Sequence, residues 1–399
     1  MTFNYIANGK LYFWDGGKTE ELTSGVLTSY IDRVRDSAQR NEWKHSGEGA
    51  KFREAFDPGA DAESRIAAVS SRIFCAAPLG ESLIYSLAID RTTGIYKRTP
   101  GTRTEGIVIS SGDYAYQDFD IRGERVVVSA AFAGESHIGV MVMHSPDCRI
   151  YTEGHCWDSC PVWSAHEQDV IYYASAGLAE RTEEASPRPM DMSQMVTQMF
   201  TASAPVSRGP SAIMKLNIHA GTLDEFLSDE RYDFVRPQSM SDGSLYYIRR
   251  PYAVEKGESP LGCLGDLLML PFRLVGALFG FLNVFTAKYS GKTLSKSAGT
   301  KARDEEKMFI DGNLINAEAE LRANRSRGEQ NPGIIPHSWE LRCRRPDGED
   351  VLIRRGAAAY RVDEESGDIL FSNGSAVIRI TQDGKEEKLL TAEKVTFIR

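Results

Sequence analysis

The chain has 399 residues, of which 41% are hydrophobic and 10% aromatic, a composition that excludes disorder along the whole chain. Its net charge of −9, from 56 acidic and 47 basic residues, argues against a nucleic-acid-binding protein, because a phosphate-binding surface needs an excess of basic residues. The first residues show no secretion signal, so a cytoplasmic protein is predicted. Its six cysteines are mostly scattered, as expected for reduced thiols.

Short strand-like runs separated by tight turns recur along the chain. In the first run, Asn8-Gly9 supplies the positive φ angles that a two-residue hairpin turn requires. The second run, residues 70–101, is predicted to turn at Thr93-Gly94. Six such units are predicted, the fourth and fifth being interrupted, at residues 3–24, 70–101, 118–154, 161–229, 236–356 and 358–390.

Two of these units carry a repeat motif. The fourth contains PVWS followed by VIYYAS, and the fifth contains SMSDGSLYYI. Both are similar to the WSPDG repeat of TolB-like β-propellers, although the fourth unit has AHEQD in place of Pro-Asp-Gly. The matching positions are Pro161, Trp163, Ser164, Ile171, Tyr172, Ser241, Asp242, Gly243, Leu245 and Tyr246. The resemblance implies a propeller and no particular activity, because propellers host many functions.

The repeat therefore predicts an all-β fold, a six-bladed β-propeller with helical insertions. The final strand, KVTFIR, is expected to complete the N-terminal blade and so to remove a free sheet edge. Residues 1–254 would form blades one to four and the start of blade five, 255–335 an apolar and basic helical insertion, and 336–399 the remainder. A pair of β-sandwich domains is the alternative that strand patterns leave open.

Two segments interrupt the strand pattern before the large insertion. Residues 25–50 contain apolar side chains at helical spacing, which predicts a helix packed against the propeller. Residues 178–211 are rich in Ser, Pro and Met and lack periodicity, so a long mobile loop is predicted there. Four methionines of that loop offer an adaptable contact surface as an alternative role: Met190, Met192, Met195 and Met199.

Motifs for catalysis or cofactor binding are weak. The YSGKT stretch at Lys292 lacks the first glycine of a phosphate-binding loop, because Thr286 stands at that position. Acidic pairs such as Asp118/Asp120 are interpreted as solvated strands or turns. No catalytic residue, cofactor or metal site is predicted, and the sequence leaves open an active site that it does not reveal.

One cysteine-rich stretch, CRIYTEGHCWDSC, is a candidate zinc site. It places Cys148, His155, Cys156 and Cys160 close together, and thiolates and imidazoles are zinc ligands. The spacing is not that of a known zinc motif, and His155 and Cys156 would point to opposite faces of a strand. Small buried thiols between blades are the preferred interpretation.

The apolar stretch LLMLPFRLVGALFGFLNVFTAK, residues 267–288, is nearly long enough to cross a bilayer. A single crossing would place the two halves of one propeller on opposite sides of the membrane, so it is not predicted. The polar residues share one narrow helical face, and lysines recur every fourth residue beyond it. Such a segment suits an anionic membrane surface, a docked partner or burial on its own propeller.

These features predict a non-enzymatic scaffold or interaction protein, attached to a membrane surface or an unknown protein partner through the insertion. The partner includes a second copy of the same chain, bound through the same segment. The protein is predicted to be cytoplasmic, including the periphery of the membrane. The predicted contact residues are Phe272, Arg273, Leu274, Leu278, Phe279, Phe281, Leu282, Phe285, Lys288, Lys292 and Lys296. The alternative is an enzyme or a sugar- or peptide-binding protein that uses the mouth of the propeller channel, with the insertion as a lid.

Overall fold

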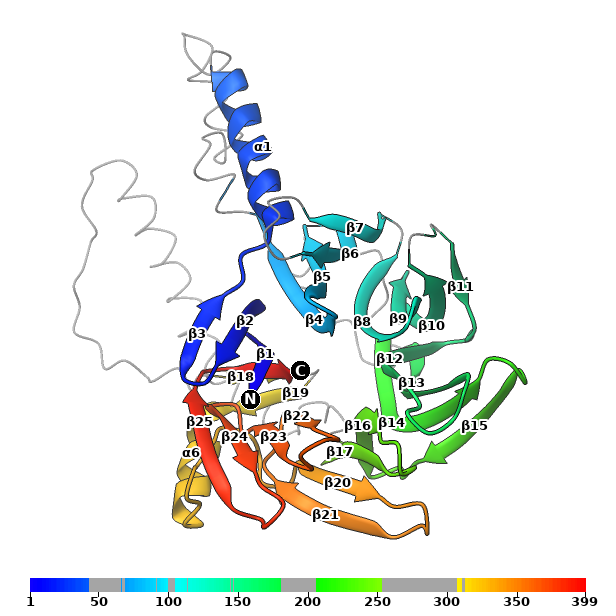
Figure 1. The fold of residues 1–399 in the computed structure, drawn as a ribbon, viewed down its shortest axis with the longest axis vertical. Helices are drawn as coiled ribbons and strands as arrows, with labels where there is room; N and C mark the ends of the chain where they lie inside the picture. The colour runs from blue at the N-terminus through cyan, green and yellow to red at the C-terminus, as the bar shows by residue number, and fades with distance from the viewer. Residues whose placement is uncertain are drawn as a thin grey trace, which may run out of the picture. The chain divides into compact units, whose positions relative to one another are not determined.

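The strands of this computed structural model form mainly antiparallel sheets that follow one another in chain order (Figure 1). It describes residues 1–42, 66, 69–90, 92–99, 105–112, 114–143, 145, 147–180, 206–252, 307–310 and 313–399. The chain divides into two units, Met1–Tyr252 with Met308–Arg399, and Ala253–Lys307. The second unit lies almost entirely outside the described residues, so the fold below is that of the first.

The first sheet joins the first and last strands of the chain. Its order is β26 (Val395–Ile398), β1 (Thr2–Ala7), β2 (Lys10–Asp15) and β3 (Lys18–Glu21). β26 runs antiparallel to β1, with Tyr5 opposite Ile398, so the predicted closure by the last strand is confirmed. The β1–β2 turn has positive φ at both Asn8 and Gly9, as the sequence predicts.

The second sheet corrects one predicted turn. Its order is β4 (Ser71–Leu79), β5 (Ser82–Ile89), β6 (Thr92–Arg98) and β7 (Gly106–Ser111). The predicted turn at Thr93-Gly94 is wrong, because both residues lie inside β6 and β5 ends before Asp90, which has a φ of 52°. Gly94 is needed for packing instead, since a Cβ there would lie 2.7 Å from the hydroxyl of Tyr96.

The third sheet has eight strands and contains two predicted units. Its members are β8 (Ala115–Arg122), β9 (Arg125–Phe132), β10 (Glu135–Val142), β11 (Cys148–Ile150), β12 (Cys156–Trp163), β13 (Val170–Glu180), β14 (Val206–Asn217) and β15 (Thr222–Leu227). The two halves meet where β10 runs parallel to β12, with Ser136 opposite Trp157. The predicted loop over 178–211 is too wide, because β13 and β14 extend into it at both ends. Its four methionines lie outside the described residues.

Two further sheets have four strands each. One contains β16 (Tyr232–Ser239), β17 (Leu245–Pro251), β20 (Glu340–Arg344) and β21 (Asp350–Arg355). The other contains β22 (Ala359–Val362), β23 (Ile369–Ser372), β24 (Ala376–Ile380) and β25 (Glu386–Thr391). β17 pairs directly with β20, so this sheet is continuous across the 88 residues between Pro251 and Glu340.

The remaining elements in the described part of the chain are short strands and two helices. β18 (Lys307–Ile310) pairs with β19 (Asn313–Asn316), and α6 (Ala317–Ser326) follows. The predicted N-terminal helix is confirmed as α1 (Gly25–Glu42), whose first turns place Leu27 and Tyr30 against the apolar cluster of the first two sheets. Asn316 caps α6 by accepting a hydrogen bond from the Ala319 amide.

Each sheet contacts the next one, and the last sheet contacts the first. β4 contacts β1 and β8, β12 contacts β8 and β16, and β22 contacts β16 and β26. This cyclic order confirms the predicted all-β propeller with helical insertions. Apart from the two-stranded sheet of β18 and β19, the described strands make five sheets, because the third and fourth units share the eight-stranded one. Six separate blades therefore remain a prediction.

The hydrophobic core lies between neighbouring sheets. Ile95 of β6 packs with Phe119 of β8 and Val128 of β9, all nearly inaccessible to solvent. A second cluster joins Phe3 and Leu370 across the first and last sheets. Each large buried side chain contributes about 1.5–3 kcal/mol, so these seams hold successive sheets together.

Candidate functional site

Charged side chains from β8, β22 and the residue after β26 lie close together. Asp120 on β8 is buried, accepts a hydrogen bond from the Trp163 amide at 2.9 Å, and forms an ion pair with Arg399. Its neighbour Asp118 accepts from the amide of Cys160 at 3.1 Å. The interpretation of this acidic pair as a solvated strand is therefore wrong, because both carboxylates are engaged by groups of distant strands.

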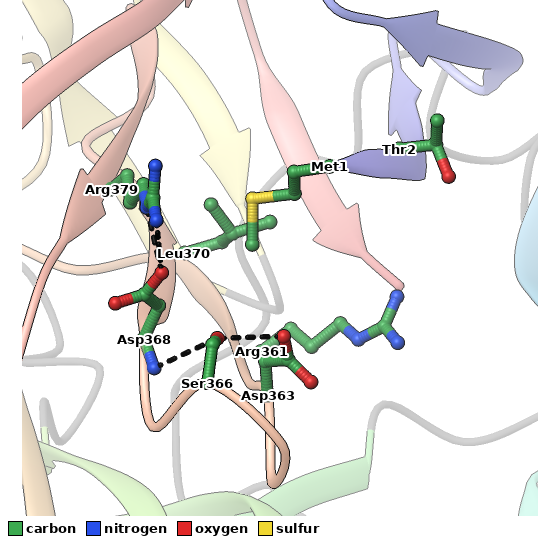
Figure 2. A pocket seen from close by; sticks show the side chains of 8 residues that line it. All are labelled: Met1, Thr2, Arg361, Asp363, Ser366, Asp368, Leu370 and Arg379. Atoms are coloured by element: carbon green, nitrogen blue, oxygen red, sulfur yellow. Dashed lines mark hydrogen bonds and ion pairs between the residues drawn. The ribbon is translucent and has the colours of Figure 1, made fainter.

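Beside these strands lies a cavity of about 220 Å³ (Figure 2). It is lined by Met1, Thr2, Arg361, Asp363, Ser366, Asp368, Leu370 and Arg379. The residues come from the start of β1, from β22, β23 and β24, and from the turn between β22 and β23. Met1 and Leu370 supply an apolar part, and the other side chains are polar or charged.

Both carboxylates of the cavity are already engaged. Asp368 is buried and accepts two hydrogen bonds from Arg379, from Nε at 2.8 Å and from Nη2 at 2.5 Å. Asp363 accepts from the hydroxyl of Ser366 at 2.7 Å, and the Asp363 amide donates to the Asp368 carbonyl at 2.9 Å. The dashed lines in Figure 2 mark the side-chain contacts of this turn. These bonds fix the turn and hold both carboxylates in position.

Arg361 differs from the other charged residues of the cavity. Its side chain is half-buried, and among the described residues its guanidinium has no hydrogen bond or ion pair. Burial and the nearby positive charge of Arg399 lower the pKa of Arg361, and Asp363 opposes this effect. Arginine nevertheless stays charged at neutral pH, so the cavity offers one guanidinium whose charge is not matched by an ion pair. That arrangement favours binding of an anion.

The cysteine-rich stretch is separated by the fold. The Sγ of Cys160 donates a hydrogen bond to the carboxylate of Asp118, whereas the Sγ of Cys148 lies next to Gly139 on β10. The Sγ of Cys156 lies 3.7 Å from Nδ1 of His137, a residue that the sequence did not single out. All five cysteines in the described part of the chain are free thiols, in agreement with the expected reduced state.

The chemistry of Cys156 follows from its surroundings. Burial, and then the carboxylates of Asp158 and Glu135, raise the pKa of the Cys156 thiol to about 12. A nucleophilic cysteine needs a thiolate at neutral pH, so this residue does not have the properties of one. The negative charges of Asp158 and Glu135 favour the binding of a cation next to Cys156.

The contact residues predicted for the insertion, from Phe272 to Lys296, all lie outside the described residues. The helices of the described ranges, α1 and α6, lack the combination of length and apolar character that crossing a bilayer requires. The sequence pointed to Asp118 and Asp120, two apart on one strand, but not to their partners, which lie far away along the chain. Arg361 and His137 were missed because no local pattern distinguishes them.

No family model matches this chain, and no curated protein matches it in sequence. Among solved structures it is similar to TolB from Acinetobacter baumannii, with 8% identity and a TM-score of 0.47, covering 100% of this chain but only 65% of that one. A putative TolB from Agrobacterium tumefaciens aligns at 12% identity and a TM-score of 0.40, covering 79% of each chain. A chain of a nidogen/laminin complex aligns at 7% identity and a TM-score of 0.46, covering 100% and 97%.

Proposed function

We propose that this chain is a propeller interaction protein that binds the carboxylate of a peptide or protein partner at Arg361. The observation that carries the proposal is the half-buried guanidinium beside the 220 Å³ cavity, which has no partner among the described residues. A buried cation without a counterion is costly, and a bound carboxylate removes this cost through charge-assisted hydrogen bonds.

The other residues of the cavity favour a singly charged anion. Asp363 and Asp368 lie at its wall, so a doubly charged phosphate meets more repulsion there than a carboxylate does. Met1 and Leu370 provide apolar surface for the neighbouring part of the ligand. A peptide carboxylate with an apolar side chain beside it combines both properties.

The same contacts favour binding over catalysis at this cavity. An enzyme at the channel mouth, the alternative from the sequence, needs convergent acidic or histidine side chains that are available for proton transfer. Here Asp368 is held by Arg379 and Asp363 by Ser366.

The test uses the full chain and peptide arrays. One array carries acetylated peptides with free C-terminal carboxylates, and a second carries the same sequences as C-terminal amides. We expect binding to the carboxylate form only, and a loss of about 10- to 100-fold in affinity for Arg361→Gln, because one charge-assisted interaction is removed. Arg325→Gln removes an exposed charge on α6 and serves as the matched control, with affinity unchanged.

Equal binding of the carboxylate and amide arrays would contradict the proposal. So would unchanged affinity of Arg361→Gln, provided that its unfolding transition matches that of the wild type. Arg361→Lys keeps the charge but not the planar fork, so we expect affinity between those of the wild type and the glutamine variant.

We further propose, from the sequence of the insertion, that residues 255–335 attach the protein to an anionic membrane surface or to a partner. The four phenylalanines between residues 272 and 285 need to be covered, and Lys288, Lys292 and Lys296 would lie along one helical side. Because β17 and β20 pair directly, a chain lacking residues 260–303 keeps both strands of that sheet.

Deletion of residues 260–303 therefore tests attachment without removing a described strand. We expect the wild type to float with vesicles that contain phosphatidylserine, and the deletion to remain in the soluble fraction with its sheet structure intact. A wild type that is monomeric and free of lipid, behaving as the deletion does, would contradict the attachment role. Binding of the wild type to neutral vesicles alone would exclude the contribution of the lysines.

A further inference from the structure

Two strands meet in parallel at the seam of the eight-stranded sheet. Ser136 of β10 lies opposite Trp157 of β12, so the residues on either side of this pair share one face. Glu135 and His137 flank Ser136, while Cys156 and Asp158 flank Trp157. The register thus places a thiol, an imidazole and two carboxylates next to one another.

Three of these side chains bring one possible metal-ligand atom each close together. An imidazole nitrogen of His137, the Sγ of Cys156 and a carboxylate oxygen of Asp158 all lie within 4.8 Å of one another. The Sγ of Cys156 is 3.7 Å from Nδ1 of His137. Tetrahedral zinc with a Zn–S bond of about 2.3 Å and a Zn–N bond of about 2.0 Å would separate these two atoms by about 3.5 Å. The observed separation therefore suits a shared metal ion.

From this geometry we propose that the seam binds one Zn²⁺ ion through Cys156, His137 and Asp158. Sulfur, nitrogen and oxygen donors together match the borderline-soft character of zinc, whereas magnesium and calcium select oxygen donors alone. Three protein ligands leave a fourth tetrahedral position for water or a further donor.

The surrounding residues hold the proposed ligands in place. Nε2 of His137 faces the carboxylate of Glu135 at 3.5 Å, the arrangement in which a carboxylate orients a metal-bound histidine. Asp158 is 1% exposed, and its two oxygens accept hydrogen bonds of 2.6 Å from Thr152 and Ser175. A carboxylate has lone pairs left after two such bonds, so it remains able to bind a metal.

The test uses the full chain, treated with a chelator and then titrated with Co²⁺ and with Zn²⁺. We expect one equivalent of Co²⁺ to give a thiolate-to-cobalt charge-transfer band in the near ultraviolet, and one equivalent of Zn²⁺ to abolish it. Cys156→Ser should lose the band. Cys148→Ser, which changes a half-buried thiol outside the cluster, should retain it and is the matched control.

Two further variants keep every cysteine. His137→Gln should weaken Zn²⁺ binding at least about 10-fold, and Glu135→Gln about 10-fold through the orientation of the histidine, with the band preserved in Glu135→Gln. These two variants decide the question even if Cys156→Ser does not fold. Three results would overturn the site: a folded wild type that takes up no metal, a band retained in Cys156→Ser, or a band lost in Cys148→Ser.

Discussion

The guanidinium of Arg399, which follows β26, forms an ion pair with the carboxylate of Asp120 on β8, 279 residues earlier in the chain. The same carboxylate accepts the backbone N–H of Trp163 on β12. One carboxylate therefore links three strands that belong to different parts of the propeller. The pair lies close to Arg361, and the positive charge of Arg399 lowers the pKa of the Arg361 guanidinium.

We predict that Asp120→Asn lowers the free energy of unfolding by about 2 kcal/mol, because it leaves a partly buried guanidinium without its counterion. Urea denaturation measures the loss. Arg399→Met added to Asp120→Asn should restore part of it, since the unpaired charge is then absent. The exposed pair of Lys10 and Glu21 is the control, and Lys10→Met should leave the transition unchanged. Strictly additive losses would show that Asp120 and Arg399 are not coupled.

Gly94 should tolerate no side chain. Its Cβ would lie 2.7 Å from the hydroxyl of Tyr96 and 3.0 Å from the carbonyl oxygen of Ile109, so Gly94→Ala should destabilise the protein by about 2 kcal/mol. Gly112→Ala is the matched control, because nothing lies within 4 Å of that position and its φ is not positive. Thermal unfolding of the two variants should differ clearly, and equal melting temperatures would contradict the packing role of Gly94.

Glu340 should make stability depend on pH. Burial alone would raise its pKa, but hydrogen bonds from Arg249 and Arg342 lower it below the ordinary value of 4.5, and Arg355 adds to this effect. A carboxyl group whose pKa is lowered in the folded state stabilises the fold when the pH is above the ordinary pKa of the group. This contribution is lost as the pH falls through the folded-state pKa.

The corresponding variant is Glu340→Gln, which should cost about 3 kcal/mol at pH 7 because three arginines lose their shared carboxylate. Urea unfolding at a series of pH values from 7 to about 3 measures the difference from the wild type. We expect this difference to shrink on the acidic side of 4.5, where the wild type also loses the charge. A difference that stays constant with pH would show that the Glu340 charge does not stabilise the fold.

Asn324 should be required for the segment that follows α6. Its side chain is 1% exposed, and its amide donates to the carbonyls of Gly333 and Ile335, both at 2.9 Å. Asn324→Ala leaves these carbonyls without that donor and should cost about 2 kcal/mol in chemical denaturation. Ser326→Ala, on the exposed side of the same helix, should have little effect. Similar losses in both variants would contradict a specific role for the Asn324 amide.

Local features of the chain predicted much of the fold correctly. Asn8-Gly9 forms the expected turn, residues 25–42 form the expected helix, and KVTFIR pairs with the first strand. Each depends on residues close in sequence or on an unpaired strand that needs a partner. The turn at Thr93-Gly94 was wrong because glycine serves turns and close packing alike, and only the position of Tyr96 distinguishes the two.

The candidate sites could not be predicted in this way. His137 and Cys156 are 19 residues apart, and their proximity depends on the parallel register of β10 and β12. Arg361 looks like any strand arginine in the sequence. Its lack of a partner within the described residues becomes visible only when the side chains around it are placed.

The sequence by itself determined the class of fold, because alternation of apolar residues and the chemistry of turns act over a few residues. It also determined the need to cover the phenylalanines between 272 and 285, since their hydrophobicity is independent of their neighbours. Only the tertiary structure decided which charges meet, as Asp120 with Arg399, and which have no ion-pair partner among the described residues, as Arg361. Ion pairs and metal sites require positions fixed to within a few ångströms, and those positions are set by the packing of whole sheets.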